Sequence, residues 1–318
     1  MSFSSSVKEE LSRHTSTARH CKIAELAALI SASGRILESE NGVSLCIQTE
    51  NEDVSRKCFT LLKKTFNIGT EIVVRKSQLK RGNVYSIAIE TLEDITRVLQ
   101  TTKLTPADRS TSGQLFMTNA IVIQKDCCKR AFLRGSFLAS GSISDPEKGY
   151  HLEIVCADQP KAQQIQEVMC SFELDAKIVM RKKSHVVYLK EGEQIVEALG
   201  LMEAGVALMN LENIRIVKEM RNSVNRKVNC ETANINKTVN AAVKQMEDIR
   251  YIERTVGFGE LNPGLEEIAR LRLQYPEATL KELGMMLDPQ VGKSGVNHRL
   301  RKLSELAEDL RETRRSLL

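Results

Sequence analysis

Near its C-terminus the chain carries four polar side chains at the spacing of one helix face. They occupy positions i, i+3, i+4 and i+7 and are Ser294, Asn297, His298 and Arg301. Asn pairs with adenine edges and Arg with guanine edges in the DNA major groove. Basic residues flank this stripe and could hold phosphates, namely Lys293, Arg299 and Lys302. The pattern predicts a surface that reads base sequence, although a basic helix face could instead bind protein.

Three helices are predicted to position this stripe. An Asn-Pro pair at 262–263 begins the first, because Pro suits the first helical position. A capping box at 279–282 begins the second. After a turn at 288–292, Ser294 is expected to cap the third, whose opposite face is apolar. Helices joined in this way are typical of a helix-turn-helix, whose last helix enters the major groove.

A second pattern lies earlier, where two nine-residue segments read alike. They run from Leu26 to Gly34 and from Leu133 to Gly141, at an offset of 107 residues. Both are rich in Ala, Ser and Gly, which allow two helix backbones to approach closely. The residue before the closing Gly is Ser33 in one copy and Ser140 in the other.

The flanking patterns repeat as well. Each small-residue helix is followed by two strands, a helix, two strands and a helix, so the expected order is αββαββα twice. The repeats cover about 20–100 and 127–200, and a polar stretch at 101–113 is expected to connect them.

Both segments resemble the LAGLIDADG helix of homing endonucleases. In that family the acid before the final Gly holds a divalent metal against the scissile phosphate. Ser33 and Ser140 replace it here, and a neutral hydroxyl is a poor ligand for a hard dication. The resemblance therefore implies the endonuclease fold without a catalytic site, and we expect no metal ion and no cofactor.

LAGLIDADG enzymes lay a saddle of strands on the duplex, so matching basic residues are of interest. Arg75-Lys76 and Arg181-Lys182 recur at an offset of 106. Paired positive patches suit phosphates. Basic residues at strand ends also aid solubility and discourage aggregation, so both interpretations stay open.

The bridge between the two halves is rich in Asn and basic residues. Asn222 and Asn225 fall on one helix face with Asn229, next to Arg226. This stretch is either a solvated linker or an amide face that touches nucleic acid or a neighbouring domain.

Composition narrows the function classes. Aromatic residues make up 4% of the 318 residues and Trp is absent, which argues against a surface built on base stacking. The net charge of +5 permits an anionic partner. An N-terminal apolar core typical of signal peptides and a run long enough to cross a membrane are both missing. We expect a cytoplasmic, nucleoid-associated protein without a membrane partner.

The eight cysteines contain no CxxC pair. Cys127 and Cys128 are adjacent, too close for an ordinary disulfide or a zinc knuckle. Apolar neighbours around Cys46, Cys58, Cys156 and Cys170 predict buried, reduced thiols.

The motifs in combination resemble the WhiA family of bacterial regulators, over essentially the whole chain. The similar stretches begin at Met1-Ser-Phe-Ser-Ser-Ser-Val-Lys, at Asn222-Ser-Val-Asn-Arg-Lys-Val-Asn and at Lys293-Ser-Gly-Val-Asn-His-Arg-Leu. The resemblance implies a transcriptional regulator of sporulation, or a role in cell division and chromosome segregation. It implies double-stranded DNA as a partner, and in some relatives a WhiB-type iron–sulfur protein or division proteins.

The predicted fold class is α+β, with a duplicated LAGLIDADG-like domain followed by an all-α helix-turn-helix domain. The expected divisions are 1–208 for the first domain, 209–258 for a helical linker and 259–318 for the second. The predicted function is DNA binding without catalysis. A scaffold acting through protein contacts is the alternative, and a metal-dependent endonuclease a remote one, because fold alone does not fix function.

Overall fold

The computed structural model describes residues 2–39, 42–76, 82–104 and 118–316 of the chain. It divides into two compact units, Met1–Glu219 and Met220–Leu318. Helix α8 (Gly205–Thr255) contributes residues to both units. Most of the predicted connection at 101–113 lies outside the described residues.

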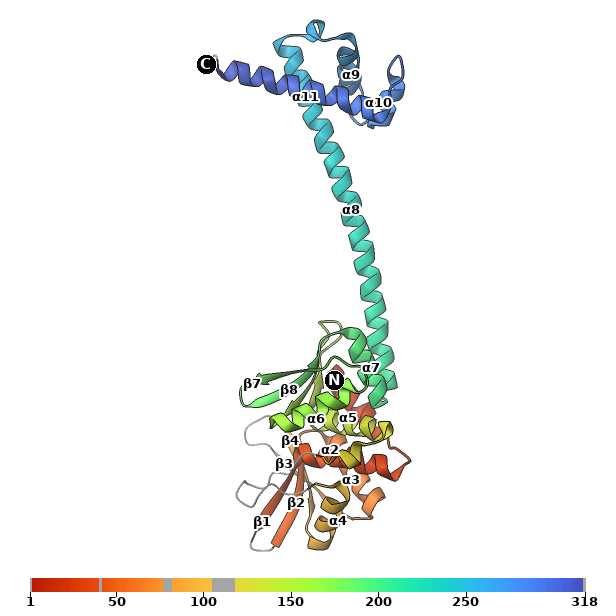
Figure 1. Cartoon of the computed structure of the whole chain (residues 1–318), viewed down its shortest axis with the longest axis vertical. Helices are drawn as coiled ribbons and strands as arrows, with labels where there is room; N and C mark the ends of the chain where they lie inside the picture. Colours follow the sequence, from red (N-terminus) through yellow and green to blue (C-terminus); the bar gives the residue numbers. More distant parts are fainter. Residues whose placement is uncertain (1, 40–41, 77–81, 105–117, 317–318) are drawn as a thin grey trace. The chain divides into compact units, whose positions relative to one another are not determined.

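The first unit contains the predicted duplication. After α1 (Phe3–Arg13), the first repeat comprises α2 (Arg19–Ser33), β1 (Gly34–Ser39), β2 (Gly42–Thr49), α3 (Glu52–Phe66), β3 (Ile72–Lys76), β4 (Asn83–Ile89) and α4 (Leu92–Thr102). After the short 3-10 helix η1 (Ala120–Ile123), the second comprises α5 (Asp126–Ser140), β5 (Gly141–Ile143), β6 (Leu152–Cys156), α6 (Gln159–Cys170), β7 (Lys177–Arg181), β8 (Ser184–Leu189) and α7 (Gly192–Met202). The predicted order αββαββα is confirmed in both copies (Figure 1).

The two sheets share one topology. Their strand orders are β1-β2-β4-β3 and β5-β6-β8-β7, and each described pairing is antiparallel. Leu45 pairs with Ile89 in the first sheet, and Leu152 pairs with Leu189 in the second. All four side chains are buried in one core, as alternation along half-buried strands requires.

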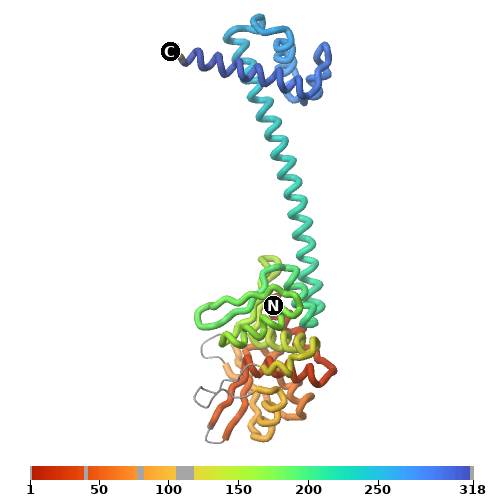
Figure 2. The backbone as a smooth tube through the Cα atoms, in the orientation of Figure 1, coloured from red at the N-terminus to blue at the C-terminus, as the bar shows by residue number. Residues whose placement is uncertain are grey.

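The central helices α2 and α5 pack against each other, so the first repeat (red to orange) and the second (yellow to green) lie side by side (Figure 2). A Cβ added at Gly135 would lie 2.4 Å from the Glu25 carbonyl oxygen and 2.9 Å from the Ala28 Cβ. Ala28 and Gly135 are equivalent at the 107-residue offset. The small residues are therefore needed for a close approach at the centre of the duplication.

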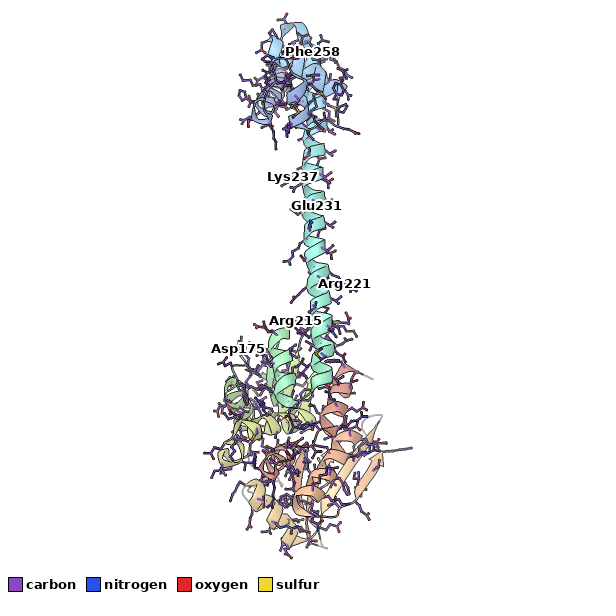
Figure 3. The ribbon with its side chains drawn as sticks, turned by 90° about the vertical axis from the view of Figure 1, so that its right-hand side faces the viewer. Asp175, Arg215, Arg221, Glu231, Lys237 and Phe258 are labelled. Carbon is purple, nitrogen blue, oxygen red and sulfur yellow. The ribbon has the colours of Figure 1, made fainter. Side chains whose placement is uncertain are left out.

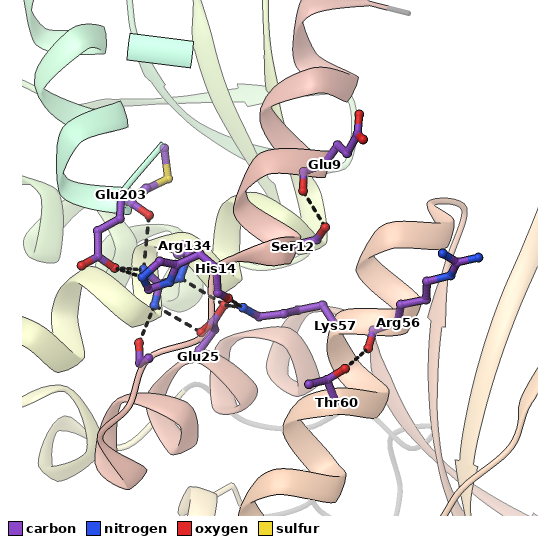
Figure 4. Close-up of polar contacts among 11 residues, drawn as sticks. Glu9, Ser12, His14, Glu25, Arg56, Lys57, Thr60, Arg134 and Glu203 are labelled. Carbon is purple, nitrogen blue, oxygen red and sulfur yellow. Dashed lines mark hydrogen bonds and ion pairs between the residues drawn. The ribbon is translucent and has the colours of Figure 1, made fainter. Parts of the chain in front are cut away.

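A buried ion cluster joins the repeats beside this contact (Figure 4). Glu25 accepts hydrogen bonds from the Nε and Nη2 atoms of Arg134, at 3.1 and 3.2 Å. The ammonium of Lys57 lies 2.9 Å from the same carboxylate. Arg134 also donates to the Met202 carbonyl at 3.2 Å and contacts Glu203. Glu25, Lys57 and Arg134 are almost fully buried, so each charge depends on these partners.

The second unit has an all-helical core. It comprises the C-terminal part of α8, η2 (Phe258–Glu260), α9 (Pro263–Gln274), α10 (Leu280–Met286) and α11 (Lys293–Ser316). Ile249 and Ile252 of α8 belong to this core, together with Leu283 and Leu300. The predicted Asn262 cap and the Thr279–Glu282 capping box are confirmed by their hydrogen bonds.

The prediction for Cys170 is wrong, because its side chain is exposed, whereas Cys46, Cys58 and Cys156 are buried. Cys170 is the last residue of α6, and the core-facing side chains of that turn are Val168 and Met169. Among the described residues, no helix is both long and apolar enough to cross a membrane.

Candidate nucleic-acid interface

Helix α11 has one face in the core and one in solvent. Val296, Leu300 and Leu303 are buried, as their spacing predicts. The predicted reading residues lie on the exposed side and are Lys293, Ser294, Asn297, His298, Arg301 and Lys302. The structure therefore brings the predicted stripe together on one surface.

The turn before α11 is fixed by a close backbone contact with α10. Val291 donates its backbone N–H to the Gly284 carbonyl at 2.9 Å. A Cβ added at Gly284 would lie 2.0 Å from the Val291 carbonyl oxygen. A glycine is required here because any side chain would push away the turn that orients α11.

One flanking residue and one member of the stripe have contacts that spacing alone did not reveal. Arg299 is half-buried and donates from Nη1 to the Gly264 carbonyl at 3.3 Å, so it also anchors α11 to α9. Arg301 donates from Nε to Glu305 at 2.9 Å within an exposed i,i+4 pair. Such a pair stabilises weakly, so Arg301 stays available for a base.

The predicted cap of α11 needs correction. The helix begins at Lys293, and Val296 donates its N–H to the Gly292 carbonyl. Ser294 therefore lies within the first turn and does not precede it. The helix then continues to Ser316. Its N-terminal amides still lie beside the stripe, where they favour a phosphate.

The Asn-rich segment belongs to α8. Asn222, Asn225 and Arg226 are exposed, as are the other side chains from Met220 to Ala241. Figure 3 shows Arg221, Glu231 and Lys237 pointing outward from this helix. The amide face is accessible to a partner and equally compatible with a solvated linker.

The sheet register makes Arg75 and Arg181 equivalent. Arg75 pairs with Val84, which precedes Ile87 by three residues in β4. Arg181 pairs with Ser184, which precedes Val187 by three residues in β8. Ile87 and Val187 are buried, so strand alternation places both arginines on the opposite face of their sheets.

The lysines that follow these two arginines in the sequence are placed differently. Lys76 follows Arg75 in β3 and so occupies the alternate face. Lys182 lies beyond the end of β7 with a positive φ of 55°. The four basic residues of the predicted saddle therefore do not share one face.

The second sheet face also carries an acid. Arg181 Nη1 donates to Glu153 at 2.8 Å, and Glu153 also contacts His151 and Ser142. Burial alone would raise the pKa of Glu153, but the hydrogen bonds from His151 and Ser142 and the charge of Arg181 lower it. A carboxylate thus offsets the positive charge on the second face.

Lysines stand beside both positions where the endonuclease family has its acids. Ser33 ends α2 and lines a hollow with Lys8 and Arg35. Ser140 ends α5 and lines a small pocket with Lys161, which donates to the Ser31 carbonyl at 3.0 Å. The cations at these places repel a dication, although Glu50 adds one carboxylate to the hollow at Ser33. Sequence spacing gave no signal for Lys8 or Lys161, because they come from other helices.

Together, the duplicated αββαββα unit and the helix-turn-helix define a LAGLIDADG-like protein with a DNA-binding module. Three family models match the chain: a WhiA N-terminal LAGLIDADG-like domain over 19–105, a WhiA LAGLIDADG-like domain over 129–221 and a WhiA C-terminal HTH domain over 224–307. The chain belongs to the WhiA family.

Individual relatives match along 96–100% of their length. The chain is 54% identical to "Probable cell division protein WhiA" of Lachnoclostridium phytofermentans, covering 98% of this chain and 100% of the relative. It is 50% identical to the protein of that name in Heliobacterium modesticaldum, covering 97% and 96%. Full-length DUF199/WhiA from Thermatoga maritima is a structural match with a TM-score of 0.59 and 25% identity, covering 97% and 99%.

Proposed function

We propose that this chain is a non-catalytic transcriptional regulator that reads duplex DNA through α11. The observation that carries the proposal is the exposed stripe of Asn297, His298 and Arg301, opposite the buried Val296 and Leu300. Its amide, imidazole and guanidinium groups suit base edges, and Lys293 and Lys302 beside it suit phosphates.

The name of the relatives, "Probable cell division protein WhiA", supports a role of this chain in cell division. The family resemblance adds control of sporulation and a part in chromosome segregation. The proposal also includes a WhiB-type iron–sulfur protein or division proteins as partners, and association with the nucleoid. In this proposal residues 1–208 form a platform, 209–258 a helical linker and 259–318 the DNA reader.

The test is a genome-wide binding profile of the tagged full-length protein and of an Asn297→Ala/Arg301→Ala variant. We expect discrete peaks near division or sporulation genes that disappear in the variant. Unchanged peaks in the variant would show that α11 is not the reader. Absence of peaks in the wild type, with division still dependent on the protein, would favour the scaffold.

We further propose that the LAGLIDADG-like unit does not cleave DNA. Ser33 and Ser140 offer no carboxylate, and Lys8 and Lys161 place positive charge beside them. Purified protein incubated with a plasmid library in magnesium or manganese should leave the plasmids intact. Site-specific double-strand cuts that vanish on Ser33→Ala substitution would contradict this.

A further inference from the structure

Four side chains of metal-ligand type meet at the N-terminal ends of α2 and α5. The Nδ1 atom of His20 lies 3.2 Å from the Sγ of Cys128, 3.3 Å from that of Cys21 and 4.0 Å from that of Cys127. The four ligand atoms all lie within 4.8 Å of one another. The three cysteines are free thiols.

The internal duplication explains why these residues meet. The offset of 107 residues that relates the two helices carries His20-Cys21 onto Cys127-Cys128. Both dipeptides therefore lie in the first turn of their helices. Ala24 and Ala131, related by the same offset, are buried with Cys21 and Cys128 in one small cluster between the helices. The adjacent cysteines look unsuitable for zinc in the sequence, but the other repeat supplies the two missing ligands.

The spacing suits a tetrahedral ion. With Zn–S near 2.3 Å and Zn–N near 2.0–2.1 Å, a tetrahedron separates nitrogen from sulfur by about 3.6 Å. The three nitrogen–sulfur distances of 3.2, 3.3 and 4.0 Å bracket that value. A set of three thiols and one imidazole also matches the soft and borderline ligands of structural zinc sites.

We propose that His20, Cys21, Cys127 and Cys128 form a zinc site that ties the two repeats together. Four protein ligands close the coordination sphere, so the ion has a structural role. The site lies at the beginning of α2 and α5, whereas Ser33 and Ser140 lie at their ends, so it is separate from the positions where the endonuclease family has its acids.

The four ligands differ in burial, so an ion can reach the site from solvent and still be held by buried ligands. Cys21 and Cys128 are buried, whereas His20 and Cys127 are exposed. The positive ends of both helix dipoles lie at the cluster and favour thiolate ligands.

The first experiment measures metal in the full-length protein purified under reducing conditions. We expect about one zinc ion per chain by elemental analysis. After removal of zinc, titration with cobalt should give the intense visible bands of tetrahedral cobalt and a thiolate-to-cobalt charge-transfer band.

Matched variants test the ligands. His20→Asn and Cys127→Ser alter exposed ligands and spare the core, and we expect each to weaken cobalt binding at least tenfold. Cys170→Ser and Cys230→Ser remove exposed thiols outside the cluster and should bind as the wild type does. A chelator should lower the melting temperature of the wild type and of these controls. It should leave the melting temperatures of His20→Asn and Cys127→Ser unchanged.

Two results would overturn the proposal. One is reduced wild-type protein that gives no tetrahedral cobalt spectrum, whether or not a Cys21–Cys128 disulfide forms when that protein is oxidised. The other is a cobalt spectrum and affinity that persist unchanged in both His20→Asn and Cys127→Ser.

Discussion

At the scale of single residues, the proposed function gives base reading and phosphate binding to neighbouring side chains of α11. Arg301 lies on the predicted base-contacting stripe, and Lys302 follows it on the exposed side. A bidentate base contact is specific for sequence, whereas a phosphate contact is not. Substitution of the two residues should therefore have different signatures.

We expect Arg301→Ala to weaken binding to the specific site by about 1–3 kcal/mol and to relax base preference at one position. Lys302→Ala should weaken specific and non-specific binding alike and reduce the salt slope by about one unit. Fluorescence anisotropy over a salt series distinguishes them. Arg13→Ala, a matched loss of an exposed i,i+4 arginine in the other unit, serves as the control. Equal effects of Arg301→Ala on specific and random DNA would contradict the assignment.

At the scale of elements, the contact between α2 and α5 combines close approach with buried charge. Gly135 fits against the Glu25 carbonyl, and the Glu25 side chain binds Arg134 and Lys57. Removing one partner leaves the remaining buried charges with less compensation. The cluster is therefore a sensitive point for the stability of the duplicated unit.

Arg134→Met should lower the free energy of unfolding by about 3–5 kcal/mol, because Glu25 loses its main partner in a buried site. Arg13→Ala breaks the exposed pair with Glu9 and should cost about 0.5 kcal/mol or less. Urea unfolding followed by circular dichroism measures both. Similar small losses for the two variants would mean that Arg134 does not stabilise the unit through its charge.

The turn that orients α11 gives a second prediction at this scale. Gly284→Ala should destabilise the helix-turn-helix by about 1–3 kcal/mol, because the added Cβ meets the Val291 carbonyl. Gly292→Ala is the matched control, since nothing lies within 4 Å of a Cβ there. Thermal unfolding of both variants provides the comparison, and equal melting temperatures would show that the turn adapts at no cost.

The elements were predictable where local pattern decides them. The repeated αββαββα order, the Asn262 cap and the apolar face of α11 follow from periodicity and capping chemistry. Contacts between distant elements were not predictable. Lys8 beside Ser33, and His20 beside Cys128, come together only through packing of helices far apart in sequence. A shift of two residues in the start of a helix, as for α11 and Ser294, is below the resolution of such patterns.

At the scale of the whole molecule, the chain carries two candidate DNA surfaces. One is the stripe on α11, and the other is the pair of equivalent sheet faces that carry Arg75 and Arg181. Glu153 offsets the charge of Arg181, so we expect DNA binding by these sheet faces to be weak, salt-sensitive and indifferent to sequence.

DNA binding by the sheet faces is tested in full-length protein in which Arg301→Ala and Lys302→Ala remove the proposed DNA contacts of α11. Residual low-salt affinity for random duplex should disappear when Arg75, Lys76, Arg181 and Lys182 are changed to Glu. Because only Arg75 and Arg181 occupy equivalent faces of the two sheets, their double substitution should account for most of that loss. No residual affinity before the charge reversal would make this unit a platform for protein partners.

Which surface reads sequence is decided by one binding measurement. The probe is the duplex most enriched in the genomic profile, and the proteins are the wild type and a variant with Asn297, His298, Arg301 and Lys302 all changed to Ala. These side chains are exposed, so the fold should persist and can be checked by circular dichroism. We predict that the variant binds the probe no better than random DNA of equal length. Unchanged affinity and preference for the probe would show that α11 is not the DNA reader.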